Sequence, residues 1–267
     1  MGRRRQEGWR EEGRAAGMAG VPIPSPAGDG TLDGPSLDRV LATSPIVEVA
    51  HIPWASNAVF QVRLDTPHGP RLAIYKPARG ERPLWDFPAG TLHRREVAVA
   101  RVDQALGWGF TPRTVLRRDG PFGRGSIQEF IEDPDPAVVP RGAALQEALA
   151  GMAVLDVLVN NADRKRAHLL VDPQGRLRGI DHGVTFHVEP KLRTVLLELG
   201  GTPVPARWLR DLRRFQADDL ARTALARELS TLLSPGETAA FDRRMRQLLQ
   251  AGVFPVLDPW RGQPWEW

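Results

Sequence analysis

The sequence predicts an α+β protein in two parts, in which short strands come first and helices follow. Three observations support this prediction. Residues 46–131 contain short apolar or alternating segments separated by turn residues such as His68-Gly69-Pro70, a pattern typical of antiparallel strands. One helical period, over residues 91–106, interrupts these strands. From Arg141 onward the spacing of the apolar residues is helical.

The individual elements follow from the same periods. In the segment 91–106 four apolar residues share one helical face, and Gly107 ends the helix. Residues 145–159 are apolar on most faces, which suits a helix buried in the centre of a lobe. The expected strands cover residues 46–52, 58–64, 71–76, 113–116 and 126–131, and three amphipathic helices are expected near 206–215, 217–233 and 236–250.

These elements group into three regions. Residues 1–38 are rich in Gly, Pro, Arg and Glu without an apolar period, so we expect a disordered N-terminal extension. Residues 40–132 form the expected N-lobe, an antiparallel sheet with one helix. The Pro-rich stretch 132–136 reads as a hinge, and residues 137–267 form a mainly helical C-lobe with a Trp-rich tail.

Composition excludes several function classes. The chain has 267 residues, of which 42% are hydrophobic and 25% charged, as in an ordinary globular protein. It has no cysteine, which excludes disulfides and thiolate metal sites and fits a cytoplasmic location. The net charge of +4 comes from basic residues spread among 32 acids, so we expect no nucleic-acid partner. We also expect no transmembrane segment, and transient contact with a membrane surface stays open.

Two acids stand out at strand boundaries. An apolar helix runs to Val159 and leads into a polar loop carrying Asp163, and the strand at 177–180 leads to Asp181. A hairpin between them would place the two carboxylates side by side, although they are 18 residues apart. Phosphoryl transfer requires one acid to orient the attacking hydroxyl and another to hold magnesium. The alternative is a surface hairpin with two solvated acids.

A lysine in the strand region fits the same chemistry. Alternation puts Lys76 at the end of an apolar row, and Glu96 lies 20 residues later on the predicted helix. Kinases have a nucleotide-ordering Lys–Glu pair in this strand-then-helix arrangement. Alternatively, Lys76 is a strand-end residue that reaches water. The polar turn at 53–57 would cover the phosphates through Ser56 and Asn57, and residues 129–131 (Glu129, Phe130 and Ile131) would border the adenine.

In this order of parts the sequence resembles the phosphatidylinositol 3-/4-kinase-like family, an atypical, HipA-related branch of the kinase-like superfamily. It is most similar to a small actinobacterial branch of that family. The stretches that carry the resemblance are 53–60, 75–87, 160–168, 179–189 and 190–196, and it spans roughly residues 40–260. The family's catalytic loop, D-R-x-x-x-N, matches Asp163 to His168 except at its last position. The resemblance implies a two-lobed protein-kinase-like fold with ATP and Mg²⁺ bound between the lobes.

By this match Asp163 is the catalytic acid, Asp181 the magnesium ligand, and Lys76 the phosphate-binding lysine with Glu96 as its partner. Arg164, Lys165 and Arg166 would add positive charge near the transferring group. His168 departs from the family pattern, since magnesium prefers oxygen ligands. Either Asn160 or Asn161 supplies the missing oxygen, His168 contacts phosphate, or catalysis is impaired. A zinc site built from His168, His182 and His187 fits no common spacing.

The sequence therefore predicts an ATP- and Mg²⁺-dependent kinase that acts on a hydroxyl acceptor. A phosphoinositide or other lipid, a protein serine and a small metabolite all remain open as acceptors, because a fold does not fix a substrate. The alternative is a pseudokinase, a nucleotide-binding or scaffold module without turnover. No oligomeric state is predicted.

Overall fold

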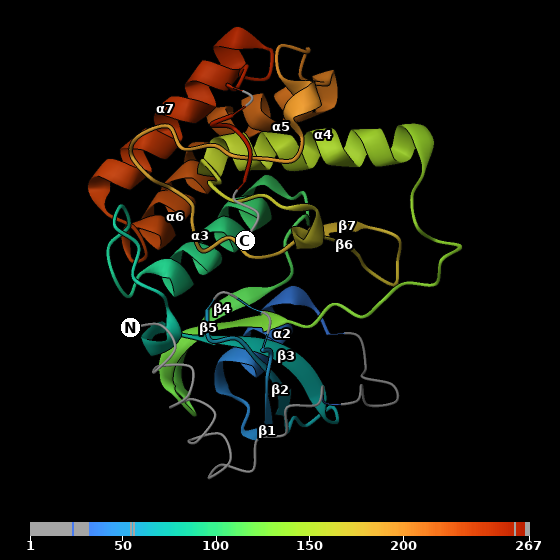
Figure 1. Cartoon of the computed structure of the whole chain (residues 1–267), viewed down its shortest axis with the longest axis vertical. Helices are drawn as coiled ribbons and strands as arrows, with labels where there is room; N and C mark the ends of the chain where they lie inside the picture. The colour runs from blue at the N-terminus through green and yellow to red at the C-terminus, as the bar shows by residue number, and fades with distance from the viewer. Residues whose placement is uncertain (1–22, 24–31, 54, 56, 259, 265–267) are drawn as a thin grey trace. The chain divides into compact units, whose positions relative to one another are not determined.

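The computed structural model describes residues 23, 32–53, 55, 57–258 and 260–264 (Figure 1). The chain divides into two compact units. Unit 1 contains residues up to 97 together with 113–130, and unit 2 contains 98–112 and 131 onward. The described residues contain a five-stranded antiparallel sheet, a two-stranded hairpin and six α-helices, which confirms the predicted α+β class.

Unit 1 is built on the five-stranded sheet. Its strands are β1 (Ile46–His51), β2 (Phe60–Leu64), β3 (Arg71–Pro77), β4 (Thr114–Gly120) and β5 (Gly123–Glu129). Their order in the sheet is β1-β2-β3-β5-β4, and every pairing is antiparallel. The central strand β3 is therefore bonded on both sides. This fixes the position of Lys76, whose Cα partner is Ser126 of β5.

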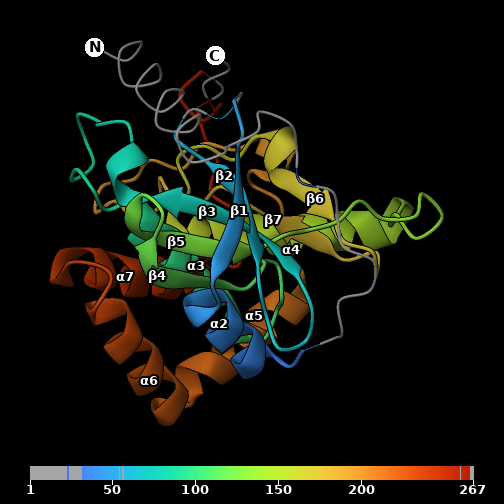
Figure 2. The ribbon, with the colours of Figure 1, turned by 90° about the horizontal axis from the view of Figure 1, so that it is seen from below.

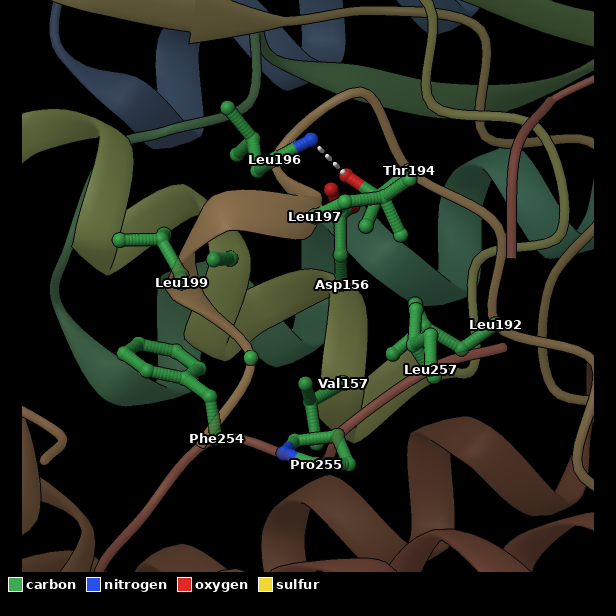
Figure 3. Close-up of a pocket in the computed structure, with 12 residues that line it drawn as sticks. Asp156, Val157, Leu192, Thr194, Leu196, Leu197, Leu199, Phe254, Pro255 and Leu257 are labelled. Carbon is green, nitrogen blue, oxygen red and sulfur yellow. Dashed lines mark hydrogen bonds between the residues drawn. The ribbon is translucent and has the colours of Figure 1, made fainter. Parts of the chain in front are cut away.

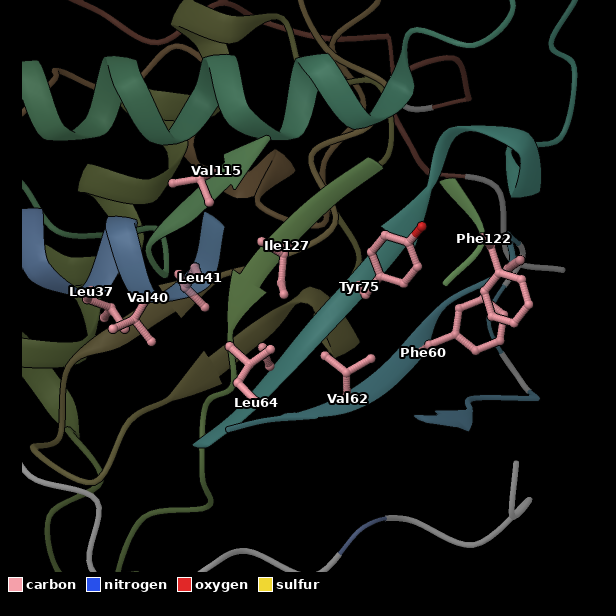
Figure 4. Packing of buried hydrophobic residues seen from close by; sticks show 12 residues of the cluster. Leu37, Val40, Leu41, Phe60, Val62, Leu64, Tyr75, Val115, Phe122 and Ile127 are labelled. Atoms are coloured by element: carbon pink, nitrogen blue, oxygen red, sulfur yellow. The ribbon is translucent and has the colours of Figure 1, made fainter. Parts of the chain in front are cut away.

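A helix that the sequence did not predict covers part of this sheet. Helix α2 (Gly34–Thr43) packs against β4 and β5 (Figures 1 and 2). Its buried leucines and valine join the aromatic and aliphatic side chains of the sheet in one apolar core (Figure 4). Within that core Phe60 stacks on Phe122 at 4.6 Å between ring centroids.

Helix α2 overlaps the last five residues of the expected disordered extension. Asp33 caps the helix by accepting a hydrogen bond from the backbone N–H of Ser36 at 2.8 Å, and Pro35 lies in its first turn. Both residues are helix-start signals, but they lie in a stretch dominated by Gly and Pro. Of the remaining extension, residues 1–22 and 24–31 lie outside the described residues.

Unit 2 is organised around helix α4 (Gly142–Val159), whose second half is buried on nearly all sides. Helices α5 (Ala206–Ala217), α6 (Asp219–Ser230) and α7 (Pro235–Ala251) pack on one another, and α7 also contacts α4. Helix α3 (Leu92–Leu106) crosses the boundary between the units. By length and composition α4 could span a membrane, but half of its apolar window is buried in this structure, as in a core helix.

A short hairpin follows α4 in unit 2. The 3-10 turn η2 (Arg166–His168) leads into β6 (Leu169–Val171), which pairs antiparallel with β7 (Leu177–Gly179). Residues 180–196 then return along the end of α4, and the turn η3 (Leu197–Leu199) leads toward α5. The hairpin and the returning segment carry the candidate catalytic residues.

Candidate active site

Asn160 turns the chain at the end of α4. It caps the helix in the left-handed conformation (φ 54°), a region that asparagine tolerates better than most residues. Its side-chain amide donates to the carbonyls of His187 (2.9 Å) and Glu189 (2.6 Å), and its oxygen accepts from the N–H of Lys191 (2.8 Å). Asn160 therefore fastens the segment 187–191 to the end of α4, and its oxygen is already occupied.

Asn161 has a similar structural role. Its side chain is fully buried, donates to Asp156 Oδ1 at 2.9 Å and accepts from the N–H of Asp163 at 3.0 Å. It was predicted as a metal ligand, but the structure places its side chain inside the loop, where it orients Asp163. The two asparagines that could have replaced the oxygen missing at position 168 both bond within the protein.

Arg164 also lies differently from the prediction of charge near the transferring group. It is fully buried, and its guanidinium makes two hydrogen bonds to Asp156, at 2.8 and 2.9 Å. It also donates to the carbonyl of Ile180 at 3.1 Å and lies 2.7 Å from His182 Nε2. Arg164 thus neutralises a carboxylate of α4 and joins the loop of Asp163 to the segment of Asp181.

Asp163 is a partly buried carboxylate that pairs with a lysine. Its Oδ2 pairs with Lys165 Nζ at 3.0 Å, while Oδ1 is buried and has no hydrogen-bond partner among the described residues. Burial raises the pKa of Asp163, the pairing with Lys165 lowers it, and the nearby charge of Asp181 raises it. An acceptor oxygen without a partner can take a hydrogen bond from a substrate hydroxyl.

Asp181 follows β7 and adopts a strained backbone. Its φ of 59° is rare for a residue other than glycine, and such strain is concentrated at functional sites. Its side chain is 49% exposed, and His168 Nε2 lies 3.4 Å from its Oδ2. The carboxylate and the imidazole thus meet at the open side of the hairpin.

Asp181 and His168 together suit a divalent metal ion whose remaining ligands are substrate phosphates and water. Among the described residues no group of three or more His, Asp or Glu is arranged to hold a metal. Mg²⁺ is commonly bound by one or two carboxylates together with substrate phosphates and water. Asp181, with His168 beside it, fits that mode. His187 accepts from the N–H of Glu189, which keeps its Nδ1 engaged outside any metal cluster.

Lys76 and Glu96 meet in unit 1. Lys76 Nζ lies 2.6 Å from Glu96 Oε1, and both side chains are largely buried, with 17% and 3% exposed. Strand β3 positions the lysine, and the first turns of α3 position the glutamate. The neighbouring Arg95 is buried, with its guanidinium 4.9 Å from the ring centroid of Phe87.

The other residues predicted to contact the nucleotide bond or pack within the protein where the structure describes them. Asn57 uses its side-chain oxygen to accept from the N–H of Arg82 at 2.8 Å, and Ser56 lies outside the described residues. Glu129 accepts from the N–H of Arg113 at 3.2 Å, and Phe130 packs beside Ala50 and Leu72 in unit 1. Ile131 is the first residue of this segment assigned to unit 2.

The structural roles of Asp156 in α4 and of His182 after β7 were not predicted from the sequence. Asp156, only 1% exposed, accepts hydrogen bonds from Arg164 and Asn161. His182 Nε2 lies 2.7 Å from Arg164 Nη2. A signal for Asp156 existed, since a carboxylate in a helix that is otherwise apolar needs a buried partner.

One curated relative covers most of the chain. Protein Rv2133c of Mycobacterium tuberculosis (strain ATCC 25618 / H37Rv) is 36% identical over 262 residues, which are 85% of this chain and 93% of that protein. The chain belongs to the Rv2133c family. No family model matches this member of the Rv2133c family.

Solved structures show the fold of this Rv2133c-family chain. Hydra Fam20 with sugar has a TM-score of 0.59 at 14% identity, covering 86% of this chain and 91% of that one. The Golgi casein kinase with Mn and ADP bound has a TM-score of 0.56 at 16% identity, covering 85% and 80%. At these identities the likeness establishes a kinase-like fold, as predicted. A closer relation to the phosphatidylinositol kinases stays a prediction.

Proposed function

We propose that this Rv2133c-family chain is a phosphotransferase that uses ATP and a divalent metal to phosphorylate a hydroxyl group. The observation that carries the proposal is the convergence of Asp163 and Asp181. They are 18 residues apart, yet Arg164, next to Asp163, donates to the carbonyl of Ile180, next to Asp181, at 3.1 Å. A kinase-like fold with a buried Lys–Glu pair supports the same chemistry.

Each residue has a distinct proposed role. The unpartnered Oδ1 of Asp163 accepts the hydrogen bond of the acceptor hydroxyl and directs its oxygen toward the phosphorus. Asp181, with His168, would hold a divalent metal ion, whose charge would offset the negative charge of the nucleotide phosphates. Lys76, kept in place by Glu96, binds phosphate oxygens, and Lys165 adds a cation beside Asp163. Catalysis then depends on positioning and on fixed charges.

Arg164 is a positioning residue in this mechanism. It bonds to Asp156 in α4 and to the carbonyl of Ile180, the residue before Asp181. Asn161 donates to the same carboxylate, that of Asp156, and accepts a hydrogen bond from the backbone N–H of Asp163. The buried Arg164–Asp156 pair therefore connects the loop of Asp163 to the segment of Asp181.

Within the kinase-like fold, the D-R-x-x-x-H loop supports a place in the phosphatidylinositol 3-/4-kinase-like class. The acceptor is a hydroxyl of a lipid, a protein serine or a small metabolite. Incubation of the full chain with labelled ATP and each acceptor class in turn identifies the group that receives the phosphate. Transfer should require divalent metal and disappear in Asp181→Asn.

A second candidate is a pseudokinase that binds nucleotide without turnover. The observation that favours it is that the amide oxygens of Asn160 and Asn161, the two candidates for the missing metal ligand, both accept hydrogen bonds within the protein. Steady release of ADP or autophosphorylation, abolished in Asp163→Ala, supports the enzyme. ATP binding with no turnover in either protein supports the pseudokinase.

A further inference from the structure

A second feature of unit 2 is an open pocket of about 530 Å³ beside α7, which we call the α7 pocket. Its size falls in the range of sites that bind small organic ligands. Five parts of the chain line it: the end of α4, the segment after Asp181, the turn after η3 at Gly201, the last turns of α7 and the segment that follows α7. The lining residues on which the argument depends are Val188, Val253, Val256, Arg243, Arg244 and Ala251.

The walls of the α7 pocket are mainly apolar, and several of their side chains are exposed to solvent. Three of its valines, Val188, Val253 and Val256, have 45%, 40% and 79% of their surface exposed. Exposed apolar side chains gathered at a concave site usually mark a binding surface. A single apolar ligand covering them would remove this surface from water.

A smaller cavity of about 20 Å³ adjoins the α7 pocket (Figure 3). Five residues line both cavities, among them Leu192 and Leu257, which lie close together in the close-up. The segments 192–199 and 254–257 therefore pack against α4 without filling all the space, which leaves the apolar wall room to adjust to a ligand.

The polar end of the α7 pocket is cationic. Arg243 and Arg244 line it, and no Asp or Glu is among its lining residues. Arg244 donates to the carbonyls of Leu158 (2.8 Å) and His187 (3.2 Å), but its Nη2 is buried without a hydrogen-bond partner among the described residues. Burial and the charge of Arg243 lower the pKa of Arg244 to about 10, and no carboxylate offsets either effect.

We propose that the α7 pocket binds a single-chain amphiphile with an anionic head group. The apolar chain lies against the valines and leucines, and the head group pairs with Arg244 and Arg243. A guanidinium forms its strongest hydrogen bonds with carboxylates and phosphates, so both head groups have the required chemistry. The α7 pocket is a site separate from Asp163 and Asp181, and binding to it needs no nucleotide.

Calorimetry on the full chain without nucleotide tests this proposal. The probes are dodecanoate and dodecyl phosphate below their micelle concentrations, with dodecanol and dodecyltrimethylammonium as uncharged and cationic controls. We expect one molecule of either anion to bind per chain, and the two control amphiphiles to bind at least about tenfold more weakly, since a charge-assisted bond is lost. Equal binding of all four would overturn the proposal.

Variants locate the site. Ala251→Trp fills the α7 pocket from an exposed position and should abolish binding, whereas Gln250→Trp, exposed on the same helix but outside the lining, should not. Arg243→Gln should weaken the anions several-fold, and Arg246→Gln should leave them unchanged. Arg244→Gln should weaken binding of the anions as well. If that variant does not fold, Arg244→Lys replaces it, because lysine keeps the positive charge but loses the guanidinium.

A second experiment distinguishes a free amphiphile from a lipid in a membrane. Vesicles of an anionic phospholipid and vesicles of a zwitterionic one are mixed with the chain, and sedimentation measures the bound fraction. Binding to anionic vesicles without binding of the monomeric probes would contradict a pocket for a single chain and indicate a membrane-binding surface. Retained binding of dodecanoate in Ala251→Trp would also contradict it.

Discussion

Arg164 and Asp156 form a fully buried ion pair, with Arg164 Nη2 2.8 Å from Asp156 Oδ1 and Nε 2.9 Å from Oδ2. The pair links helix α4 to the loop that carries Asp163. Arg164 also reaches the carbonyl of Ile180, so one side chain connects the two segments of the candidate site. Because both side chains are buried, Arg164 contributes to the geometry of the candidate site.

Removal of Arg164 should destabilise the protein strongly. Arg164→Met leaves the carboxylate of Asp156 buried without its cation, a change that costs about 3–5 kcal/mol of unfolding free energy. Urea unfolding followed by tryptophan fluorescence measures this loss. The matched control is Arg166→Met, an exposed position two residues away, which should change stability by less than about 0.5 kcal/mol. Similar values for the two variants would contradict the structural role of Arg164.

Asp163 should lower the stability of the protein while it serves the reaction. Because burial raises its pKa in the folded state, the folded protein binds the proton more tightly than the unfolded chain does. The protonated Asp163 therefore stabilises the folded state at low pH. This contribution to the free energy of unfolding is lost as the pH rises from 3.8, the ordinary pKa of the carboxyl, through its raised pKa in the folded protein. We expect Asp163→Asn to melt at a higher temperature than the wild type at neutral pH, and to show no phosphoryl transfer.

Melting curves between about pH 3 and about pH 8 check the sign of this effect. The difference between Asp163→Asn and the wild type should grow as pH rises and then level off. Asp219→Asn, whose carboxylate is 86% exposed, should follow the wild type throughout. A variant that is less stable than the wild type at neutral pH would show that Asp163 is a stabilising acid instead.

The Lys76–Glu96 pair allows its structural and functional roles to be separated. Lys76→Met leaves Glu96, 3% exposed, without its partner and should cost about 3 kcal/mol. The double variant Lys76→Met/Glu96→Gln removes both charges and should regain most of that stability. Neither variant should bind ATP, because the cation that meets the phosphates is gone. ATP affinity that returns with stability in the double variant would make the pair structural only.

His168 should set the metal preference. Its imidazole lies 3.4 Å from Asp181 Oδ2, at the position where the D-R-x-x-x-N loop that the sequence resembles has an asparagine, and Mg²⁺ prefers oxygen. His168→Asn should therefore lower the Mg²⁺ concentration needed for half-maximal ATP binding several-fold. Titration of Mg²⁺ at fixed ATP measures this shift. An unchanged Mg²⁺ requirement would place His168 outside the metal site.

Most of the fold was predictable because its signals are local. The strands are short apolar or alternating segments, and α3 ends before Gly107, which has a φ of 72°. Helix α2 was missed because its start signals, Asp33 and Pro35, stand in a Gly- and Pro-rich stretch. Its apolar face, Leu37, Val40 and Leu41, covers only two turns.

The chemistry of the site was less predictable than its residues. Arg164 lies in the run Arg164-Lys165-Arg166, which reads as a solvated basic loop, yet only Arg164 is buried. Its burial depends on Asp156, eight residues earlier, and on the return of the chain near His182. The α7 pocket could not be predicted at all, because its walls come from segments as distant as Val157 and Leu257.

Binding of ATP with and without divalent metal tests the central claim most directly. Calorimetry compares the wild type, Asp181→Asn and the exposed-site control Asp219→Asn, with Mg²⁺ and with Mn²⁺. The account predicts metal-dependent binding of one ATP in the wild type and the control, and loss of the metal dependence in Asp181→Asn. ATP binding that ignores the metal, or no binding by a folded wild type, would contradict a phosphotransferase site at Asp163 and Asp181.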